Sequence, residues 1–202
     1  YLAKIGFLGG RVTAAHTVFL TDAEIEIMRE KGVGSAHCPT SNMKLASGVA
    51  RVPDMLAKGI RLGLGTDGAA SNNDLSMWEE MDTAAKLHKV FSGDPKNVSA
   101  VQAFEMATIG GARALHLEDR IGSIEPGKLA DIAIVDLDTL HQTPLYNVYS
   151  HIVYATKASD VRTVIINGRL VMLDRRLLTL NESAIKKDAN AYRRKIIDSL
   201  KN

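Results

Sequence analysis

The sequence predicts an α/β domain built on a parallel sheet. Three short apolar runs occupy residues 11–16, 33–38 and 60–64, and each is followed by a loop and a helical pattern. Strands that alternate with helices describe successive βα units, in which helices cover a parallel sheet. Two architectures fit: an open doubly wound sheet and a segment of a (β/α)8 barrel. A whole barrel needs about 250 residues, so a barrel could be present only in part.

Signals for a helix follow the first strand directly. Thr21 and Glu24 have the spacing of a capping box, and Leu20 with Ile25 has that of a hydrophobic staple. Gly32 suits the left-handed position that ends a helix. These residues predict a helix between the first and second strands.

The second and third units follow the same order. Residues 39–48 are expected to form a long loop, and Pro53 begins a helix that stops at Gly59. After the third strand, a polar loop covers residues 65–73. Asp74 is then expected to cap a helix that runs to about residue 90.

The pattern becomes antiparallel in the C-terminal third. A helix is expected over residues 99–115, and strands over 130–137, 161–166 and 169–172. Asn167-Gly168 joins the last two strands as a tight hairpin turn. An amphipathic helix follows over residues 182–200, and we interpret its basic side as a solvated face. The predicted domains are therefore residues 1–120, 121–180 and 181–202.

Composition and charge exclude several classes of protein. The 202 residues are 46% apolar and 24% charged, as in globular domains, which excludes a disordered chain, a collagen and a disulfide scaffold. A net charge of +2 gives no overall field for nucleic acid or a membrane. Cys38 is the single cysteine, and no apolar run reaches the length of about 18 residues that a membrane span needs. We therefore expect a cytoplasmic protein. The first residue, Tyr1, indicates either processing or a piece of a longer chain.

Three ionisable residues stand where the three predicted strands end: His16, His37 and Asp67. Both architectures build their sites at the carboxyl ends of parallel strands. A carboxylate there can ligate a cation with one oxygen and accept a proton with the other. Taken singly, His16 could be a packing or capping residue and Asp67 part of a turn. Together the three residues favour a site.

Other candidate residues have simpler interpretations. Cys38 should point away from His37, because consecutive strand residues face opposite sides, and we expect it to be buried. The loop at residues 65–73 lacks the spacing of a phosphate-binding loop. The remaining histidines are expected to be surface or packing residues: His88, His116, His141 and His151.

Three segments resemble the amidohydrolase superfamily. Residues 14–16 read AAH, residues 37–45 read HCPTSNMKL and residues 65–74 read GTDGAASNND. Within the superfamily they are most similar to the 5-methylthioadenosine/S-adenosylhomocysteine deaminases. The resemblance implies the last three βα units of a (β/α)8 barrel, followed by part of a composite β-sandwich domain and a C-terminal helix.

The resemblance also implies residue roles. Asp67 is similar to the aspartate that ligates zinc and shuttles the proton of a bound water, and His16 to the histidine that contacts this water. His37 matches no fixed role. The family's other metal ligands are a His-x-His pair and the histidine of a His-x-x-Glu pair, whose glutamate is the acid that protonates the substrate ring. Neither spacing occurs in the 202 residues. The implied cofactor is therefore Zn2+, or another divalent metal, in an intact enzyme. This chain alone is expected to be inactive and to hold no stoichiometric zinc.

The implied activity is hydrolytic deamination of a small purine nucleoside such as methylthioadenosine or S-adenosylhomocysteine, by a hydrolase of C–N bonds in cyclic amidines. We expect a homo-oligomer, or association with a missing N-terminal half, because a severed barrel edge exposes apolar flanks. No nucleic acid or membrane partner is expected. Two alternatives stay open: a related amidohydrolase that acts on a chlorotriazine, guanine or cytosine, and a non-catalytic half-barrel that serves as an assembly module.

Overall fold

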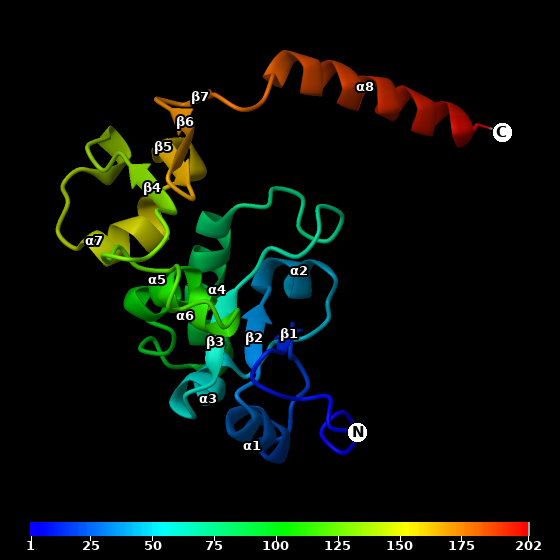
Figure 1. The fold of residues 1–202 in the computed structure, drawn as a ribbon, viewed down its shortest axis with the longest axis vertical. Helices are drawn as coiled ribbons and strands as arrows, with labels where there is room; N and C mark the ends of the chain where they lie inside the picture. Colours follow the sequence, from blue (N-terminus) through cyan, green and yellow to red (C-terminus); the bar gives the residue numbers. More distant parts are fainter. Residues whose placement is uncertain (202) are drawn as a thin grey trace. The chain divides into compact units, whose positions relative to one another are not determined.

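The computed structural model describes residues 1–201. The chain divides into two compact units (Figure 1). The first comprises residues 1–129 and 136–160, and the second comprises residues 130–135 and the chain from residue 161 onward. A parallel sheet organises the first unit and an antiparallel sheet the second. The sequence-based domain ranges remain a prediction.

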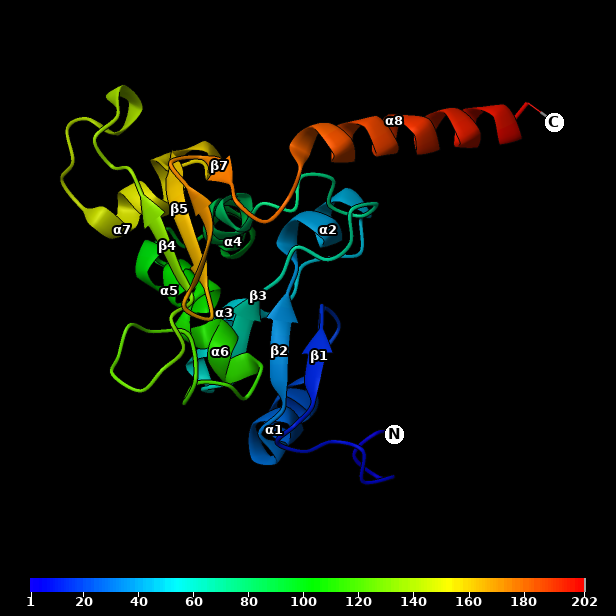
Figure 2. The same cartoon turned by 45° about the horizontal axis from the view of Figure 1, so that its top comes forward.

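The parallel sheet of the first unit has three strands in the order β1-β2-β3: β1 (Thr13–Ala15), β2 (Gly34–His37) and β3 (Arg61–Leu64). Figure 2 shows the three arrows running in the same direction. Ala15 lies opposite Ala36, and Ala36 opposite Gly63. The parallel pairing that the sequence predicts is therefore confirmed.

Helices cover one face of this sheet and form the hydrophobic core with it. They are α1 (Asp22–Lys31), α3 (Val52–Ala57), α4 (Met77–Ser92) and α5 (Ala100–Ala107). Their apolar side chains pack with those of the strands and exclude water, which is the main stabilising contribution to such a fold. The large side chains at the centre of this core are Ile25, Val33, Val52, Met55, Leu62, Met81, Val98 and Met106.

The ends of α1 form as the sequence predicts. The Glu24 amide donates to Thr21 Oγ1 at 3.3 Å, and the Thr21 amide donates to Glu24 Oε2 at 2.8 Å. Gly32 follows the helix with φ of 64°. A left-handed residue at this position favours glycine because glycine has no Cβ.

The opposite face of the sheet receives α6 (Ile109–Ala114). The approach is close enough to require glycine in the strands. A Cβ on Gly34 would lie 2.0 Å from the Ala114 carbonyl oxygen, and one on Gly63 would lie 2.7 Å from the Gly111 Cα. These small residues let the helix backbone contact the strands directly.

Three sequence-based assignments were wrong: the loop over residues 39–48, the N-cap of α4 and the single helix over residues 99–115. Residues 39–44 form a short helix, α2 (Pro39–Lys44), within the stretch expected to be a loop. Its inward side chains include Ser41 and Asn42, which are polar, so the segment lacks the apolar periodicity that would indicate a helix. The helix α4 has Ser76 as its N-cap, not Asp74; Asp74 instead accepts a hydrogen bond from the Ser76 amide at 3.0 Å.

The helix expected over residues 99–115 is interrupted. Thr108 has φ of −125° and ψ of −105°, which separates α5 from α6. A Cβ on Gly110 would lie 2.7 Å from the Glu105 carbonyl oxygen and 2.8 Å from that of Leu62. The break therefore turns the chain back onto the sheet at a point where only glycine fits.

Short helices complete the first unit. They are η1 (Leu140–Gln142), α7 (Val148–Ser150), η2 (His151–Ala155, a π-helix) and η3 (Ala158–Asp160). Val153, from η2, is 1% exposed and belongs to the hydrophobic core.

The second unit has four antiparallel strands in the order β4-β5-β6-β7: β4 (Ile132–Val135), β5 (Val161–Ile166), β6 (Arg169–Leu173) and β7 (Arg176–Leu177). The predicted Asn167-Gly168 hairpin is confirmed. Both turn residues have positive φ, 50° and 72°, as a type I′ turn requires.

The last helix is α8 (Glu182–Ser199), close to its predicted range. Its apolar residues Ile185, Tyr192 and Ile196 are 49%, 65% and 59% exposed. Within residues 1–201, no helix is both long and apolar enough to cross a membrane.

Candidate functional site

His16 and Asp67 lie in the loops that follow β1 and β3. Both adopt left-handed backbone conformations, with φ of 67° for His16 and 63° for Asp67. Such values are uncommon for residues other than glycine, and they gather at functional sites. The turn takes each side chain out of the alternation of its strand. The structure therefore brings together two of the three residues that the sequence grouped.

The Asp67 carboxylate is held by hydroxyl groups. Ser41 Oγ and Ser71 Oγ each donate to Asp67 Oδ2 at 2.6 Å. Two donors on one oxygen fix the rotation of the carboxylate, and with it the direction of the second oxygen. The same two hydrogen bonds, followed by one from the Gly68 amide, lower the pKa of Asp67 to about 2. The carboxylate is therefore an anion at neutral pH.

The His16 ring lies beside this carboxylate. Its Nε2 is 4.0 Å from Asp67 Oδ2, and the two side chains are 38% and 34% exposed. On the other side of the ring, Nδ1 lies 2.9 Å from Asn42 Oδ1. An amide oxygen accepts hydrogen bonds and cannot donate them, so Nδ1 donates to Asn42 and Nε2 faces the side of Asp67.

His37 does not join this cluster. It is the last residue of β2, and its side chain points into the helical layer, where its Nε2 lies 3.0 Å from His88 Nε2. The two rings are 0% and 1% exposed. Burial lowers the pKa of both histidines, and the neighbouring His88 lowers that of His37 further. The pair is neutral and lies away from solvent.

The remaining sequence interpretations have these outcomes. Cys38 is buried and free, as expected. His88 is a packing residue, again as expected, although its partner His37 was not anticipated. His141 Nε2 lies 3.0 Å from Asp160 Oδ2.

The serines and amides around Asp67 and His16 were missed by sequence reasoning. Ser41 and Asn42 stand in a stretch expected to be a loop, and Ser71 stands in a polar loop with several hydroxyl and amide residues. One sequence pattern could have indicated these contacts: a polar segment follows each of two neighbouring parallel strands. The carboxyl ends of neighbouring strands meet at one edge of the sheet, so the two segments are expected to lie close together.

The cluster fits one ligand position of a divalent cation. Asp67 offers a carboxylate that is ionised and rotationally fixed, and carboxylate oxygen is a ligand of zinc. Among residues 1–201, no group of three or more histidine, cysteine, aspartate or glutamate side chains is arranged to hold a metal ion. The described part of the chain therefore fits a contribution to a metal site and not a complete one.

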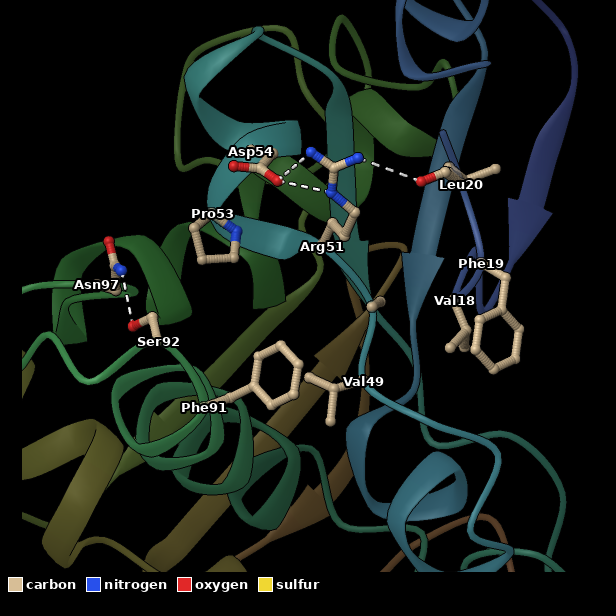
Figure 3. Close-up of a pocket in the computed structure, with 11 residues that line it drawn as sticks. Val18, Phe19, Leu20, Val49, Arg51, Pro53, Asp54, Phe91, Ser92 and Asn97 are labelled. Carbon is tan, nitrogen blue, oxygen red and sulfur yellow. Dashed lines mark hydrogen bonds and ion pairs between the residues drawn. The ribbon is translucent and has the colours of Figure 1, made fainter. Parts of the chain in front are cut away.

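A separate pocket of about 510 Å³ opens elsewhere in the first unit (Figure 3). Phe19 and Phe91 contribute to its apolar walls, and Arg51 lies at one side. The Arg51 guanidinium is held by Asp22 Oδ1 at 2.7 Å and by Asp54 Oδ2 at 2.6 Å. Its charge is thus balanced within the protein.

Comparison with known sequences finds one matching family and relatives that are named deaminases. The model of the amidohydrolase family matches residues 1–171. The chain is 50% identical over 199 residues to a 5-methylthioadenosine/S-adenosylhomocysteine deaminase of Desulforudis audaxviator, covering 98% of this chain and 46% of that protein. It is 47% identical over 196 residues to a 5'-deoxyadenosine deaminase of Methanosarcina acetivorans, covering 97% and 45%.

Similar solved structures include two zinc-containing hydrolases. An adenosine deaminase from Xanthomonas campestris with bound zinc matches with a TM-score of 0.95 and 42% identity, over 98% of this chain and 45% of that one. Atrazine chlorohydrolase from Arthrobacter aurescens, complexed with zinc, matches with a TM-score of 0.85 and 28% identity, over 94% and 42%. The chain spans less than half the length of these relatives.

Proposed function

Because the chain belongs to the amidohydrolase family, we propose that it carries the Asp67 and His16 portion of an active site that hydrolytically deaminates an adenosine derivative. The observation that carries this proposal is the Asp67 carboxylate, fixed by two serine hydroxyls and placed beside the His16 ring. An ionised carboxylate next to a histidine can take and return a proton, as hydrolysis requires.

The chemistry follows from these two side chains. When bound, zinc supplies a Lewis acid that lowers the pKa of water. Asp67 accepts one proton of the attacking water, while the His16 Nε2 lone pair orients the remaining O–H. A C–O bond forms at the purine carbon that carries the amino group, and the C–N bond at that carbon breaks. Asp67 then returns the proton to the departing nitrogen, which leaves as ammonia.

The metal would be held in part by Asp67. Its carboxylate fits one coordination position, and the fit rests on its ionised state and fixed rotation. We infer that the other ligands come from sequence outside these 202 residues, since catalytic zinc usually has about three protein ligands. The three-part domain division, self-association or association with a missing N-terminal half, and the cytoplasmic location also remain predictions.

The choice of adenosine derivatives rests on the degree of similarity. The relatives at about 50% identity are named deaminases of methylthioadenosine, S-adenosylhomocysteine or 5'-deoxyadenosine. The atrazine chlorohydrolase is 28% identical. Together with the adenosine deaminase at 42% identity, these names support adenosine derivatives, with an altered 5' position in the sequence relatives, as the proposed substrate class.

Ammonia release tests this proposal. The intact protein that contains this chain, loaded with zinc, should release ammonia from 5'-methylthioadenosine, S-adenosylhomocysteine or 5'-deoxyadenosine. Guanine, followed by ammonia release, and atrazine, followed by chloride release, serve as controls for the alternative ring substrates. Turnover of a control in place of all three nucleosides would reject the deaminase assignment in favour of another family activity. No turnover of any compound would favour the non-catalytic module.

A further inference from the structure

Glu80 is a fully buried carboxylate behind the site. It lies in the first turns of α4 and is 0% exposed. No lysine or arginine within residues 1–201 forms an ion pair with it, so its charge is balanced by hydrogen bonds: the Thr40 amide donates to Oε2 at 3.2 Å, and Asn72 Nδ2 donates to Oε1 at 2.6 Å. Burying a carboxylate is costly unless such donors are present.

Each oxygen of Glu80 holds a different segment of the site, namely the start of α2 and the loop that follows β3. Thr40 directly precedes Ser41, and Asn72 directly follows Ser71. These two serines are the residues that donate to Asp67 Oδ2. The contacts therefore close a ring, in which Glu80 holds the start of α2 and one loop, and the serines of these two segments hold Asp67.

The first arm of this ring satisfies the start of α2. Pro39 is the first residue of that helix and has no N–H, and the N-cap Cys38 makes no side-chain capping bond. Thr40 therefore supplies the first backbone donor of the helix. Glu80 Oε2 accepts this bond and so fixes where the helix, and Ser41 with it, begins.

The second arm uses both ends of the Asn72 amide. Its Nδ2 donates to Glu80 Oε1, while its Oδ1 accepts from the Leu75 amide at 2.9 Å. Asn72 is 6% exposed. Reversing the amide would break both contacts, so this arm requires an acceptor at Glu80.

We propose that Glu80 is a positioning residue for Asp67, holding α2 with Ser41 and the loop with Ser71 so that both hydroxyls reach the same carboxylate oxygen. This inference rests on the proposed function in so far as Asp67 acts on metal and water. Residues that orient a metal ligand from behind commonly change metal affinity or activity by about 10- to 100-fold when they are replaced.

Because Asn72 needs a hydrogen-bond acceptor at position 80, the donor and the acceptor of this contact can be exchanged by replacing both residues. In Glu80→Gln, one oxygen still accepts from Thr40, but the new amide nitrogen meets the Asn72 amide nitrogen, and two donors face each other. Adding Asn72→Asp reverses that second contact, because the glutamine amide then donates to a carboxylate. The other oxygen of that carboxylate still accepts from Leu75. The double replacement therefore keeps every hydrogen bond of the ring.

The experiment compares four forms of the intact protein: wild type, Glu80→Gln, Glu80→Gln with Asn72→Asp, and Glu79→Gln. Glu79 is the matched control, since it neighbours Glu80 on the same helix but lies at the surface, 3.4 Å from Lys157. Zinc affinity is measured by competition with a chelator, kcat and KM by ammonia release, and amide hydrogen exchange over residues 38–47 and 65–75 by mass spectrometry.

We expect Glu80→Gln to lower zinc affinity and kcat by about 10- to 100-fold with little change in KM. Amide hydrogen exchange in both segments, residues 38–47 and 65–75, should be faster. The double replacement should restore all three quantities toward wild type, and Glu79→Gln should leave them unchanged. Wild-type zinc affinity and exchange in Glu80→Gln, or a loss that the double replacement leaves in place, would overturn the proposal.

Failure of the variant to fold and failure of the proposed function can each be distinguished from failure of the Glu80 proposal. If Glu80→Gln does not fold, the double replacement decides: recovery of zinc binding and loop protection supports the proposal, and failure to fold again overturns it. If the wild type releases no ammonia from any nucleoside, the proposed function fails, whereas zinc affinity and hydrogen exchange still test Glu80.

Discussion

His16 and His37 stand at the ends of neighbouring parallel strands, yet they occupy opposite environments. His16 follows β1 in a left-handed turn and reaches solvent beside Asp67. His37 is still part of β2, so the alternation of the strand directs its ring into the helical layer, against His88. Position at a strand end is therefore insufficient to predict a site residue. The backbone conformation at that position decides which side the ring faces.

The largest expected effect concerns Asp67, which lies beside the partly exposed His16. In the intact, zinc-loaded protein, Asp67→Asn should lower kcat for ammonia release by about 1,000-fold or more, because the amide can neither accept the proton of water nor offer an anionic ligand. The melting temperature should change little, since the side chain is partly exposed. Asp94→Asn, in a surface turn, is the control. Near-wild-type turnover in Asp67→Asn would remove the residue from the mechanism.

Replacing the buried His37 should change the stability of the fold, whereas replacing His16 should not. His37→Ala should destabilise the protein by about 2–4 kcal/mol, because it leaves a cavity and an unpaired His88 in the core. His16→Ala should change stability by less than about 0.5 kcal/mol, as expected for a partly exposed side chain. Chemical denaturation measures both free energies of unfolding. Equal losses in the two variants would show that the contrast in burial has no energetic consequence.

Much of the fold was predictable because its signals are local. Thr21, Glu24 and Gly32 mark the ends of α1, and Asn167-Gly168 marks the hairpin, through contacts between residues only a few positions apart. Three apolar runs separated by helices were enough to predict parallel strands. These elements depend on short-range backbone geometry, which sequence patterns describe well.

The site was only partly predictable because its remaining contacts join distant residues. Ser41 and Asp67 are 26 positions apart, and His37 and His88 are 51 apart. No periodicity indicates that a serine will meet a particular carboxylate. The break at Thr108 likewise depends on how closely α6 packs on glycine residues of the sheet. Such features are set by packing across the domain and have no local signature.

Acid should weaken the fold through the buried histidine pair. The pKa values of His37 and His88 fall to about 3 and about 4, from 6.5. Above pH 6.5 both are neutral in the folded and unfolded states. As the pH falls below 6.5, the unfolded chain binds protons that the folded pair resists, so stability is lost progressively toward pH 4, by about 1 kcal/mol per pH unit for each histidine.

Urea unfolding between pH 7 and pH 5 measures this slope. Replacing the pair by His37→Leu with His88→Leu should flatten the pH dependence, because the two groups that differ between the folded and unfolded states are gone. The reference is His116→Leu with His151→Leu, which removes two histidines outside the buried pair. If the two double replacements show the same slope, the buried pair does not control acid stability.

The smallest effect concerns the orientation of His16. Asn42 Oδ1 accepts from His16 Nδ1 at 2.9 Å and so selects the ring form with a free Nε2. Asn42→Ala should lower kcat by about tenfold with KM little changed, since the ring remains but loses its preferred form. Nitrogen NMR of His16 should show hydrogen on Nδ1 in the wild type and a mixture of both forms in the variant. Asn97→Ala, whose amide contacts Ser92, is the control. An unchanged His16 spectrum in Asn42→Ala would mean that the surrounding loop orients the ring, and the exposed histidine would then owe its direction to its left-handed backbone alone.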